Sequence, residues 1–318
     1  MANQTLEGNK HKGRNQVIGA KAEIRETILG RPCHIVVDDS DGSGSEFIDA
    51  ARAELQRLTE KFSSSHPDSV ISQINASAGS DTVTAIDPET DSLFNYVSAM
   101  WEQSRHMFDP STRILSECYN GRSTVDGIDA SLKAPLQKVG WSKLEFTDEG
   151  VRLPQQGMSI DLNSCIRPYA ADRTCKLLAS KGAKNIMIDL GNDIATSGKQ
   201  PDGANWLVGI RHPRGSRTAI TRIKLNDKGY AIRGDFENTL TFAGERFSRA
   251  LSPVDGKPVP GLLTVAVVAD SGLEACTAAN IARLKTEPAA IKWLDSIGLQ
   301  WLGITRDLQS VGPLAPSN

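Results

Sequence analysis

The chain has 318 residues, of which 39% are hydrophobic and 23% are charged, and its formal net charge is −2. This composition is typical of a folded globular protein and excludes a disordered chain. The near-neutral charge gives no sign of a partner such as nucleic acid or an anionic membrane. No apolar run approaches the roughly 18–20 residues that a transmembrane helix requires.

The polar segment 1–16 predicts a flexible tail without an export signal, and the tail 308–318 is also expected to be loose, leaving one domain over 17–307. Without a signal we expect a cytoplasmic protein, or a periplasmic one if a signal has been removed. The scattered cysteines contain no CxxC pair, which favours free thiols in a reducing compartment. They are Cys33, Cys118, Cys165, Cys175 and Cys276.

In the first half of the chain, alternating residues predict strands at 17–25 and 33–38. Apolar residues at helical spacing predict an amphipathic helix over 47–62 and a second helix over 88–107, with Pro88 in its first turn. The segment 120–157 is expected to be mostly loop with one short hairpin.

The second half alternates strands and helices. MSIDL (158–162) predicts a strand, followed by a polar turn and a helix that begins near Pro168. A further strand that ends in a turn is expected at 185–193. Other strands are expected at 206–213, 219–225, 228–235, 262–270 and 299–307, and helices at 271–284 and 288–297. Because many strands sit in hairpins, the predicted fold class is α+β, or mixed α/β, and not a regular βαβ array.

Two turns could bind a ligand. The backbone N–H groups between Leu162 and Pro168 could hold a phosphate at a helix start, or the turn could be an ordinary connection capped by Asn163 or Ser164. In MIDLGNDI, Gly191 allows a tight turn. Asp189 and Asp193 on either side of it could bind metal or ribose, or simply form a surface turn.

Three other positions carry possible ligand groups. Arg249 could bind a phosphate oxygen pair or could be a solvated loop residue. Cys276 and Asn280 share one helix face, but a thiol and an amide are poor ligands for Mg²⁺. Asp109, before Pro110, is either a loop residue or a ligand contact.

Taken in order, these segments resemble the FAD:protein FMN transferases, the ApbE family, from about residue 17 to residue 305. The stretch 58–75 (LTEKFSSSHPDSVISQIN), MFDPS, VGWSKLEF and IDLNSCIRPYAAD each resemble a family motif. So do IDLGND, WLVGIRHP, IRGDFE and SPVDGKP. The family motif DLGGIAKGYAVD matches this chain at Asp161, Leu162, Tyr169, Ala170 and Asp172.

The resemblance implies an ApbE-like fold of mixed sheets with packed helices. It implies that FAD is cleaved with the help of a divalent metal, usually Mg²⁺. The FMN part passes to a threonine of a flavin-acceptor protein, which is protein flavinylation. A homologue that binds flavin or another nucleotide without transfer, or one that serves as an interaction scaffold, remains an alternative.

By the same resemblance, Arg249 and Ser252 fall at catalytic positions. The cofactor-binding positions are Asp109, Asp161, Asn163, Arg167, Tyr169, Asp172, Gly191, Arg233 and Arg249. The metal positions are the backbone carbonyl near Ile166 and the side chains of Cys276 and Asn280. Because both side-chain ligands are replaced, we expect most affinity for a divalent metal to be lost, and we hypothesise that Arg167, Arg233 and Arg249 stand in for the cation.

Overall fold

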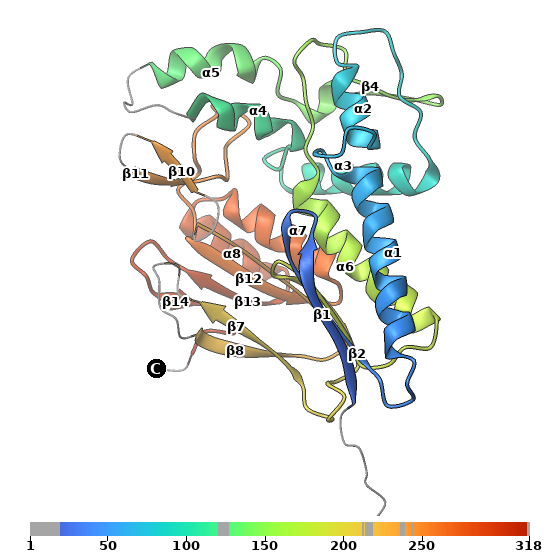
Figure 1. Cartoon of the computed structure of the whole chain (residues 1–318). Helices are drawn as coiled ribbons and strands as arrows, with labels where there is room; N and C mark the ends of the chain where they lie inside the picture. Colours follow the sequence, from blue (N-terminus) through green and yellow to red (C-terminus); the bar gives the residue numbers. More distant parts are fainter. Residues whose placement is uncertain are drawn as a thin grey trace, which may run out of the picture.

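The computed structural model describes residues 20–119, 127–211, 213, 219–235, 239–242 and 245–316. Its centre is an eight-stranded sheet with the order β1-β2-β5-β6-β9-β12-β13-β14, in which every neighbouring pair is antiparallel (Figure 1). The strands are β1 (Lys21–Ile28), β2 (Arg31–Asp38), β5 (Ile186–Leu190), β6 (Asp193–Ser197), β9 (Gly229–Gly234), β12 (Thr264–Ala269), β13 (Gln300–Ile304) and β14 (Ser310–Val311).

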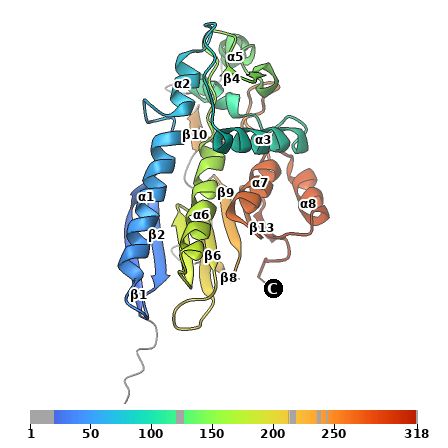
Figure 2. The ribbon, with the colours of Figure 1, turned by 90° about the vertical axis from the view of Figure 1, so that its right-hand side faces the viewer.

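Helices cover one face of this sheet. They are α1 (Gly44–Phe62), α6 (Asn163–Ser180) and α7 (Gly272–Arg283), with α8 (Glu287–Ser296) packed against α7 (Figure 2). Helix α1 buries one stripe, with Ala51, Leu55, Leu58 and Phe62 fully enclosed, because these residues recur at helical spacing. Burial of this stripe fixes α1 against the sheet.

The hairpin of β7 (Trp206–Arg211) and β8 (Ala219–Leu225) covers part of the opposite face of the sheet. Trp206 and Ile223 of the hairpin pack with Tyr230 and Ile232 of β9 in a separate apolar cluster. The core is therefore three layers deep: helices, the large sheet and the small hairpin.

Short elements form the upper part of the molecule in Figure 1. The helical ones are α2 (Val70–Ala76), α3 (Pro88–Gln103), η1 (Pro110–Thr112), α4 (Arg113–Ser116), η2 (Glu117–Tyr119), α5 (Ile128–Leu136) and η3 (Trp141–Lys143). The strands are β3 (Glu145–Thr147), β4 (Gly150–Arg152), β10 (Thr239–Phe242) and β11 (Glu245–Ser248). These elements stand above the start of α6 and bound one side of a cavity.

The predicted α+β fold class is confirmed, and most predicted elements exist within a few residues. MSIDL is an exception, because it forms no strand. The amide of Asn75 takes the place of a neighbouring strand, accepting from the N–H of Ile160 at 2.8 Å and donating to its carbonyl at 2.9 Å. The segment 120–157, expected to be mostly loop, contains α5.

Two boundaries also differ from the prediction. Helix α6 begins at Asn163, so Pro168 lies inside it and not at its start. The tail expected to be loose contains β14, and the N–H of Leu314 donates to the carbonyl of Trp301 at 3.1 Å. The predicted tail 1–16 and residues 17–19 lie outside the described residues. Across the ranges described, no helix is long and apolar enough to span a membrane.

Candidate functional site

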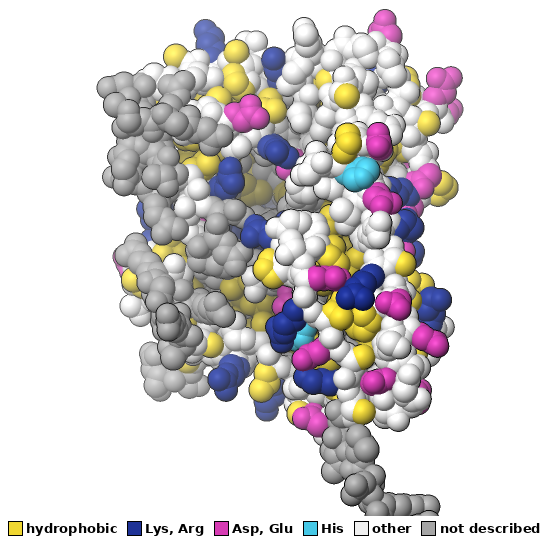
Figure 3. All heavy atoms as spheres, in the orientation of Figure 1, with side chains coloured by type: hydrophobic (Ala, Val, Ile, Leu, Met, Phe, Trp, Pro, Cys, Tyr) yellow, Lys and Arg dark blue, Asp and Glu magenta, His cyan; other side chains and the backbone are white. Residues whose placement is uncertain are grey.

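A cavity of about 590 Å³ lies between the upper elements, the start of α6, the end of β9, residues 249–251 after β11, and the end of α7. Six arginines and two aspartates, Asp109 and Asp161, line its described wall. The arginines are Arg31, Arg113, Arg167, Arg233, Arg249 and Arg283. In Figure 3, blue Lys and Arg side chains surround the hollow in the upper half of the view. The volume is typical of a small-molecule site, and the excess of guanidinium groups favours an anionic ligand.

Two of these arginines keep donors free for such a ligand. Arg167, on the first turns of α6, uses only its Nε, which lies 3.2 Å from Oδ2 of Asp193. Its terminal nitrogens have no partner in the described part of the chain. Arg249 is exposed and likewise makes no side-chain hydrogen bond or ion pair with a described residue. A guanidinium with free N–H groups can bind phosphate oxygens in pairs.

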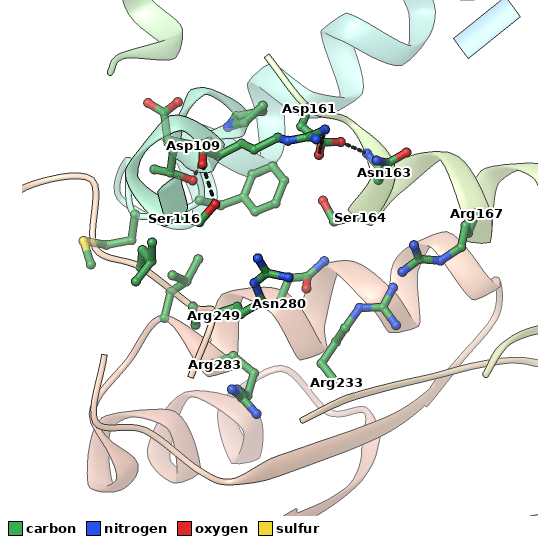
Figure 4. A pocket seen from close by; sticks show the side chains of 18 of the residues that line it. Asp109, Ser116, Asp161, Asn163, Ser164, Arg167, Arg233, Arg249, Asn280 and Arg283 are labelled. Atoms are coloured by element: carbon green, nitrogen blue, oxygen red, sulfur yellow. Dashed lines mark hydrogen bonds and ion pairs between the residues drawn. The ribbon is translucent and has the colours of Figure 1, made fainter. Parts of the chain in front are cut away.

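Arg233 is held much more tightly. Its Nη2 lies 2.7 Å from Oδ1 of Asp193, whose side chain is fully buried, and Nη1 donates to the carbonyl of Ile232 at 2.9 Å. Oδ1 of Asp193 receives no well-directed hydrogen bond, so charge attraction holds this contact. Burial is the largest effect and acts to lower the pKa of Arg233, but the charge of Asp193 and the contacts with Asp193 and Cys276 together outweigh it, and the pKa is raised. Figure 4 shows Arg167 and Arg233 turned toward each other from α6 and β9.

Cys276 on α7 joins Arg233 to the start of α6. Its Sγ donates to the carbonyl of Ser164 at 2.9 Å and accepts from Nη2 of Arg233 at 2.8 Å and from Nδ2 of Asn280 at 3.2 Å. Burial raises the pKa of the thiol to about 12. Cys276 is therefore a neutral thiol at physiological pH.

The Ser164 carbonyl is available to Cys276 because of Pro168. In an α-helix the carbonyl of residue 164 would accept from the N–H of residue 168, and proline has none. Cys276 satisfies the carbonyl that this missing bond leaves free, which helps α6 to tolerate Pro168 in its interior. The carbonyl beside Cys276 is thus that of Ser164, two residues before the Ile166 position assigned from the resemblance.

The two aspartates of the cavity wall differ in their hydrogen-bond and ion-pair partners. Asp109 is 6% exposed, and its oxygens accept from the backbone N–H groups of Ser111 at 2.9 Å and Trp141 at 2.8 Å. It stabilises the loop around Pro110 in this way. Asp161 accepts from the N–H of Asn163 at 2.8 Å and pairs with Nη1 of Arg113 at 3.0 Å. Asp161 therefore both caps the start of α6 and orients an arginine.

The cavity wall contains seven of the residues singled out in the sequence. They are Asp109, Asp161, Asn163, Arg167, Arg233, Arg249 and Asn280, while Cys276 lies directly behind Asn280. Two others are not part of the wall, and their side chains are structural. Tyr169 donates to Glu89 at 2.9 Å, and Asp172 accepts from the first N–H groups of α7, Gly272 at 2.8 Å and Leu273 at 2.9 Å. Both stay predicted cofactor-binding positions, and in this structure their side chains join helices.

Gly191 and Ser252 shape the surroundings of the cavity. Gly191 has φ +67°, and a Cβ there would lie 2.9 Å from Cβ of Arg31, so the turn can approach this arginine closely only as glycine. Oγ of Ser252 accepts from the N–H of Val254 at 3.2 Å and stabilises the Asp255-Gly256 turn. Ser252 does not belong to the described wall, so its predicted catalytic contact has no support here.

Arg31, Arg113 and Arg283 were not singled out in the sequence. Arg113 directly follows the MFDPST segment, and its position there is the one available signal. Arg283 donates to the carbonyl of Leu263 at 2.7 Å and pairs with Asp235. It therefore supports the wall and has less freedom to bind a ligand than Arg167.

The donor groups do not fit the Mg²⁺ ion that the resemblance implies. Mg²⁺ requires near-octahedral oxygen ligands. The Ser164 carbonyl here accepts from the neutral Cys276 thiol, and the sulfur in turn accepts from the Asn280 amide and the Arg233 cation. Across the described residues, no group of three or more His, Cys, Asp or Glu side chains could hold a metal.

A second cavity of about 630 Å³ lies under the β7–β8 hairpin, on the other face of the sheet. Apolar side chains such as Trp206, Tyr230 and Val36 form much of its wall, and Arg25 is the single arginine among the described residues that line it. The slightly larger volume does not make it the better anion site, because the arginines gather in the first cavity.

Several known proteins are similar to this chain in sequence. Curated relatives called "FAD:protein FMN transferase" include one from Salmonella typhimurium, 28% identical over 46% of this chain and 43% of its own length. Another, from Klebsiella pneumoniae, is 24% identical over 69% of each chain. This chain spans about two fifths of the length of the first relatives that it matches.

Solved structures show the same fold. The ApbE protein of Thermotoga maritima has a TM-score of 0.81 at 24% identity, covering 92% of this chain and 97% of that one. The flavin transferase ApbE of Vibrio cholerae has a TM-score of 0.80 at 19% identity, with the same coverage. The sequence pattern of the ApbE family matches residues 29–302, which is most of the chain. The chain therefore belongs to the ApbE family.

Proposed function

We propose that this chain binds FAD in the arginine-lined cavity and transfers its FMN part to a hydroxyl group, that of a threonine, on a partner protein. The observation that carries the proposal is the free guanidinium groups of Arg167 and Arg249, which face one cavity of suitable size in a chain of the ApbE family. The curated relatives that the chain matches are named for this reaction.

FAD carries two phosphate charges in the middle of the molecule. Arg167 and Arg249 supply the free N–H donors that match phosphate oxygens, and Arg113 is oriented by Asp161. Such fixed donors hold the diphosphate in place and stabilise the charge that develops on the leaving AMP. We assign Arg249 to substrate contact and not to proton removal, since an arginine stays protonated.

We further propose that the family metal site is non-standard in this chain. Cys276 and Asn280 occupy the positions of the side-chain ligands, and neither offers the carboxylate oxygen that Mg²⁺ prefers. The reaction therefore depends on the arginines for charge neutralisation near the start of α6.

The test is incubation of the purified protein with FAD and an ApbE-type acceptor domain. Transfer yields flavin fluorescence on the acceptor in a denaturing gel, a mass increase equal to FMN less water, and AMP in equal amount. Recovery of intact FAD from a protein that binds it, with no flavin on the acceptor, would establish binding without transfer and refute the proposal.

Single variants test the binding contacts. Arg167→Met and Arg249→Met should each raise the Kd for FAD about tenfold, because one charge-assisted hydrogen bond is worth about 1.5 kcal/mol. Arg52→Met is the matched control, since Arg52 is an exposed residue of α1 paired with Glu26 and not part of the cavity wall. An equal Kd for all four proteins would place the FAD site elsewhere.

A further inference from the structure

We infer that the cluster of Asp193, Arg167 and Arg233 replaces a divalent cation as the fixed positive charge for the diphosphate, so that this chain binds and cleaves its dinucleotide without a metal. The inference deepens the proposed function and depends on it for the cleavage step, while its binding step can be tested alone.

The first argument is position. Nη2 of Arg233 lies 2.8 Å from Sγ of Cys276, and Asn280 lies against the same sulfur at 3.2 Å. These are the two side-chain positions at which the ApbE resemblance places metal ligands. A divalent cation bound there would stand in contact with a guanidinium, and like charges at that distance repel strongly in a buried site. The guanidinium therefore occupies the place of the metal.

The second argument is that the two guanidinium groups are held in fixed positions. A single buried carboxylate, Asp193, holds both arginines, at 3.2 Å from Arg167 and 2.7 Å from Arg233. Two guanidinium groups and one carboxylate leave one net positive charge. Because the cluster is buried, with side-chain exposures of 17%, 0% and 15% for Arg167, Asp193 and Arg233, salt screens it little. Asp193 is thus a positioning residue that keeps the charge at the cavity wall.

The third argument concerns Cys276. A carboxylate at this position would pair with Arg233 and bring the net charge of the cluster to zero. The neutral thiol instead accepts a hydrogen bond from Arg233 while it donates to the Ser164 carbonyl, so the positive charge is preserved. The replacement at position 276 and the arginine at position 233 are therefore two parts of one arrangement.

The chemistry balances without a metal. The acceptor hydroxyl oxygen forms a bond to the phosphorus of the FMN half, and the bond from that phosphorus to the bridging oxygen breaks. AMP leaves with the bridging oxygen, and the hydroxyl proton is released to water. Arg167 and Arg233 face the diphosphate as negative charge moves to the leaving oxygen, which is the step that fixed cations accelerate.

Binding without metal is the first test, measured by titration calorimetry with FAD and with ADP. The Kd of each ligand measured in about 5 mM EDTA should agree within twofold with the Kd measured in about 5 mM Mg²⁺. EDTA and Mg²⁺ are each present at about tenfold the protein concentration. Titration with Mg²⁺ or Mn²⁺ alone should give no saturable heat. A Kd that rises tenfold or more in EDTA would overturn the inference.

Variants of the cluster are the second test. Asp193→Asn and Arg233→Met should each weaken ADP binding at least tenfold in EDTA, whereas Arg52→Met should not. The reciprocal variant Cys276→Asp with Asn280→Thr and Arg233→Ser should gain saturable Mg²⁺ binding and become EDTA-sensitive. Circular dichroism and thermal melting exclude variants that fail to fold. If Asp193→Asn and Arg233→Met fold and bind ADP as tightly as the parent, the inference is refuted.

Transfer assays separate the two proposals. Equal rates of acceptor flavinylation in EDTA and in Mg²⁺ support the inference. Flavinylation that occurs only with Mg²⁺ overturns it and leaves the proposed function intact. If no flavinylation occurs in either buffer, the proposed function fails, and the EDTA-independent ADP affinity still decides whether the cluster replaces the cation.

Discussion

The carboxylate of Asp193 and the guanidinium of Arg233 lie 2.7 Å apart at the wall of the cavity, on two neighbouring strands. Asp193 begins β6 and is paired in register with Ala231 of β9, so Arg233, two residues further along, points to the same face of the sheet. Helix α7 packs on that face and brings Cys276 to the pair. Sheet register, and not sequence proximity, assembles this site.

Removal of the Asp193 carboxylate should destabilise the fold. In Asp193→Ala two largely buried guanidinium groups lose their counter-ion, and breaking a buried pair in this way costs about 3–5 kcal/mol. Urea unfolding at pH 7 measures the change. Asp295→Ala, at an exposed position of α8, should stay within about 0.5 kcal/mol of the parent. A loss below about 1 kcal/mol for Asp193→Ala would contradict the buried pairing.

The Glu89 network predicts a defined pH dependence. Hydrogen bonds from Arg57, and then from Lys61 and Tyr169, lower the pKa of Glu89 far below its usual 4.5, against the opposing effect of burial. A lowered carboxyl pKa stabilises the fold fully above pH 4.5, and that contribution disappears as the pH falls toward the folded-state pKa. Glu89→Gln should therefore reduce the free energy of unfolding at pH 7 by more than at pH 3.

Urea titrations at the two pH values check this difference. Glu149→Gln, an exposed carboxylate of the β3–β4 hairpin, is the control and should change little at either pH. An equal loss for Glu89→Gln at pH 7 and at pH 3 would mean that the network does not hold the carboxylate in its charged form.

The cysteines should differ sharply in reactivity. Burial raises the pKa of Cys33, Cys175 and Cys276 to about 12, and it also raises that of Cys165. Only the thiolate reacts quickly, so with an aromatic disulfide reagent at pH 8 the native protein should release one equivalent, from the half-buried Cys118, and the unfolded protein five. Rapid labelling of Cys276 in the native protein, seen by peptide mass spectrometry, would show that its thiol is not enclosed.

Gly229 should tolerate no side chain. A Cβ there would lie 2.0 Å from the backbone N of Gly272 and from the backbone C of Ser271, at the start of α7. Gly229→Ala must push α7 away from β9, so the melting temperature should fall by 10 °C or more, since each 1 kcal/mol lowers it by about 2–4 °C in a chain of this size. Gly182→Ala, whose Cβ meets open space at φ +96°, should cost only about 1–3 kcal/mol. Equal melting points for both variants would contradict this close approach.

Local patterns in the sequence predict much of the fold, because α1 and most of the strands follow from residue spacing alone. The site is less predictable. Asp193, Arg233 and Cys276 belong to β6, β9 and α7, and only the tertiary register brings them together. The strand predicted at 158–162 fails because a side-chain amide, that of Asn75, pairs with Ile160 as a strand would.

Helix geometry explains why Tyr169 and Asp172, which were predicted to bind the cofactor, do not line the described cavity wall. Residues two apart on an α-helix point about 200° apart. Arg167 faces the cavity, so Tyr169 points away toward Glu89. Asp172 lies five residues after Arg167, and its carboxylate reaches the first turn of α7. A motif match identifies the helix correctly but does not assign its faces.

The proline inside α6 leaves a backbone acceptor that only another element can satisfy. Because Pro168 has no N–H, the carbonyl of Ser164 must find its partner outside the helix, and a thiol hydrogen and a hard cation are both acceptable to a carbonyl oxygen. A substitution of Cys276 that removes its S–H therefore leaves this carbonyl without its partner, and α6 and α7 lose one of the contacts that join them.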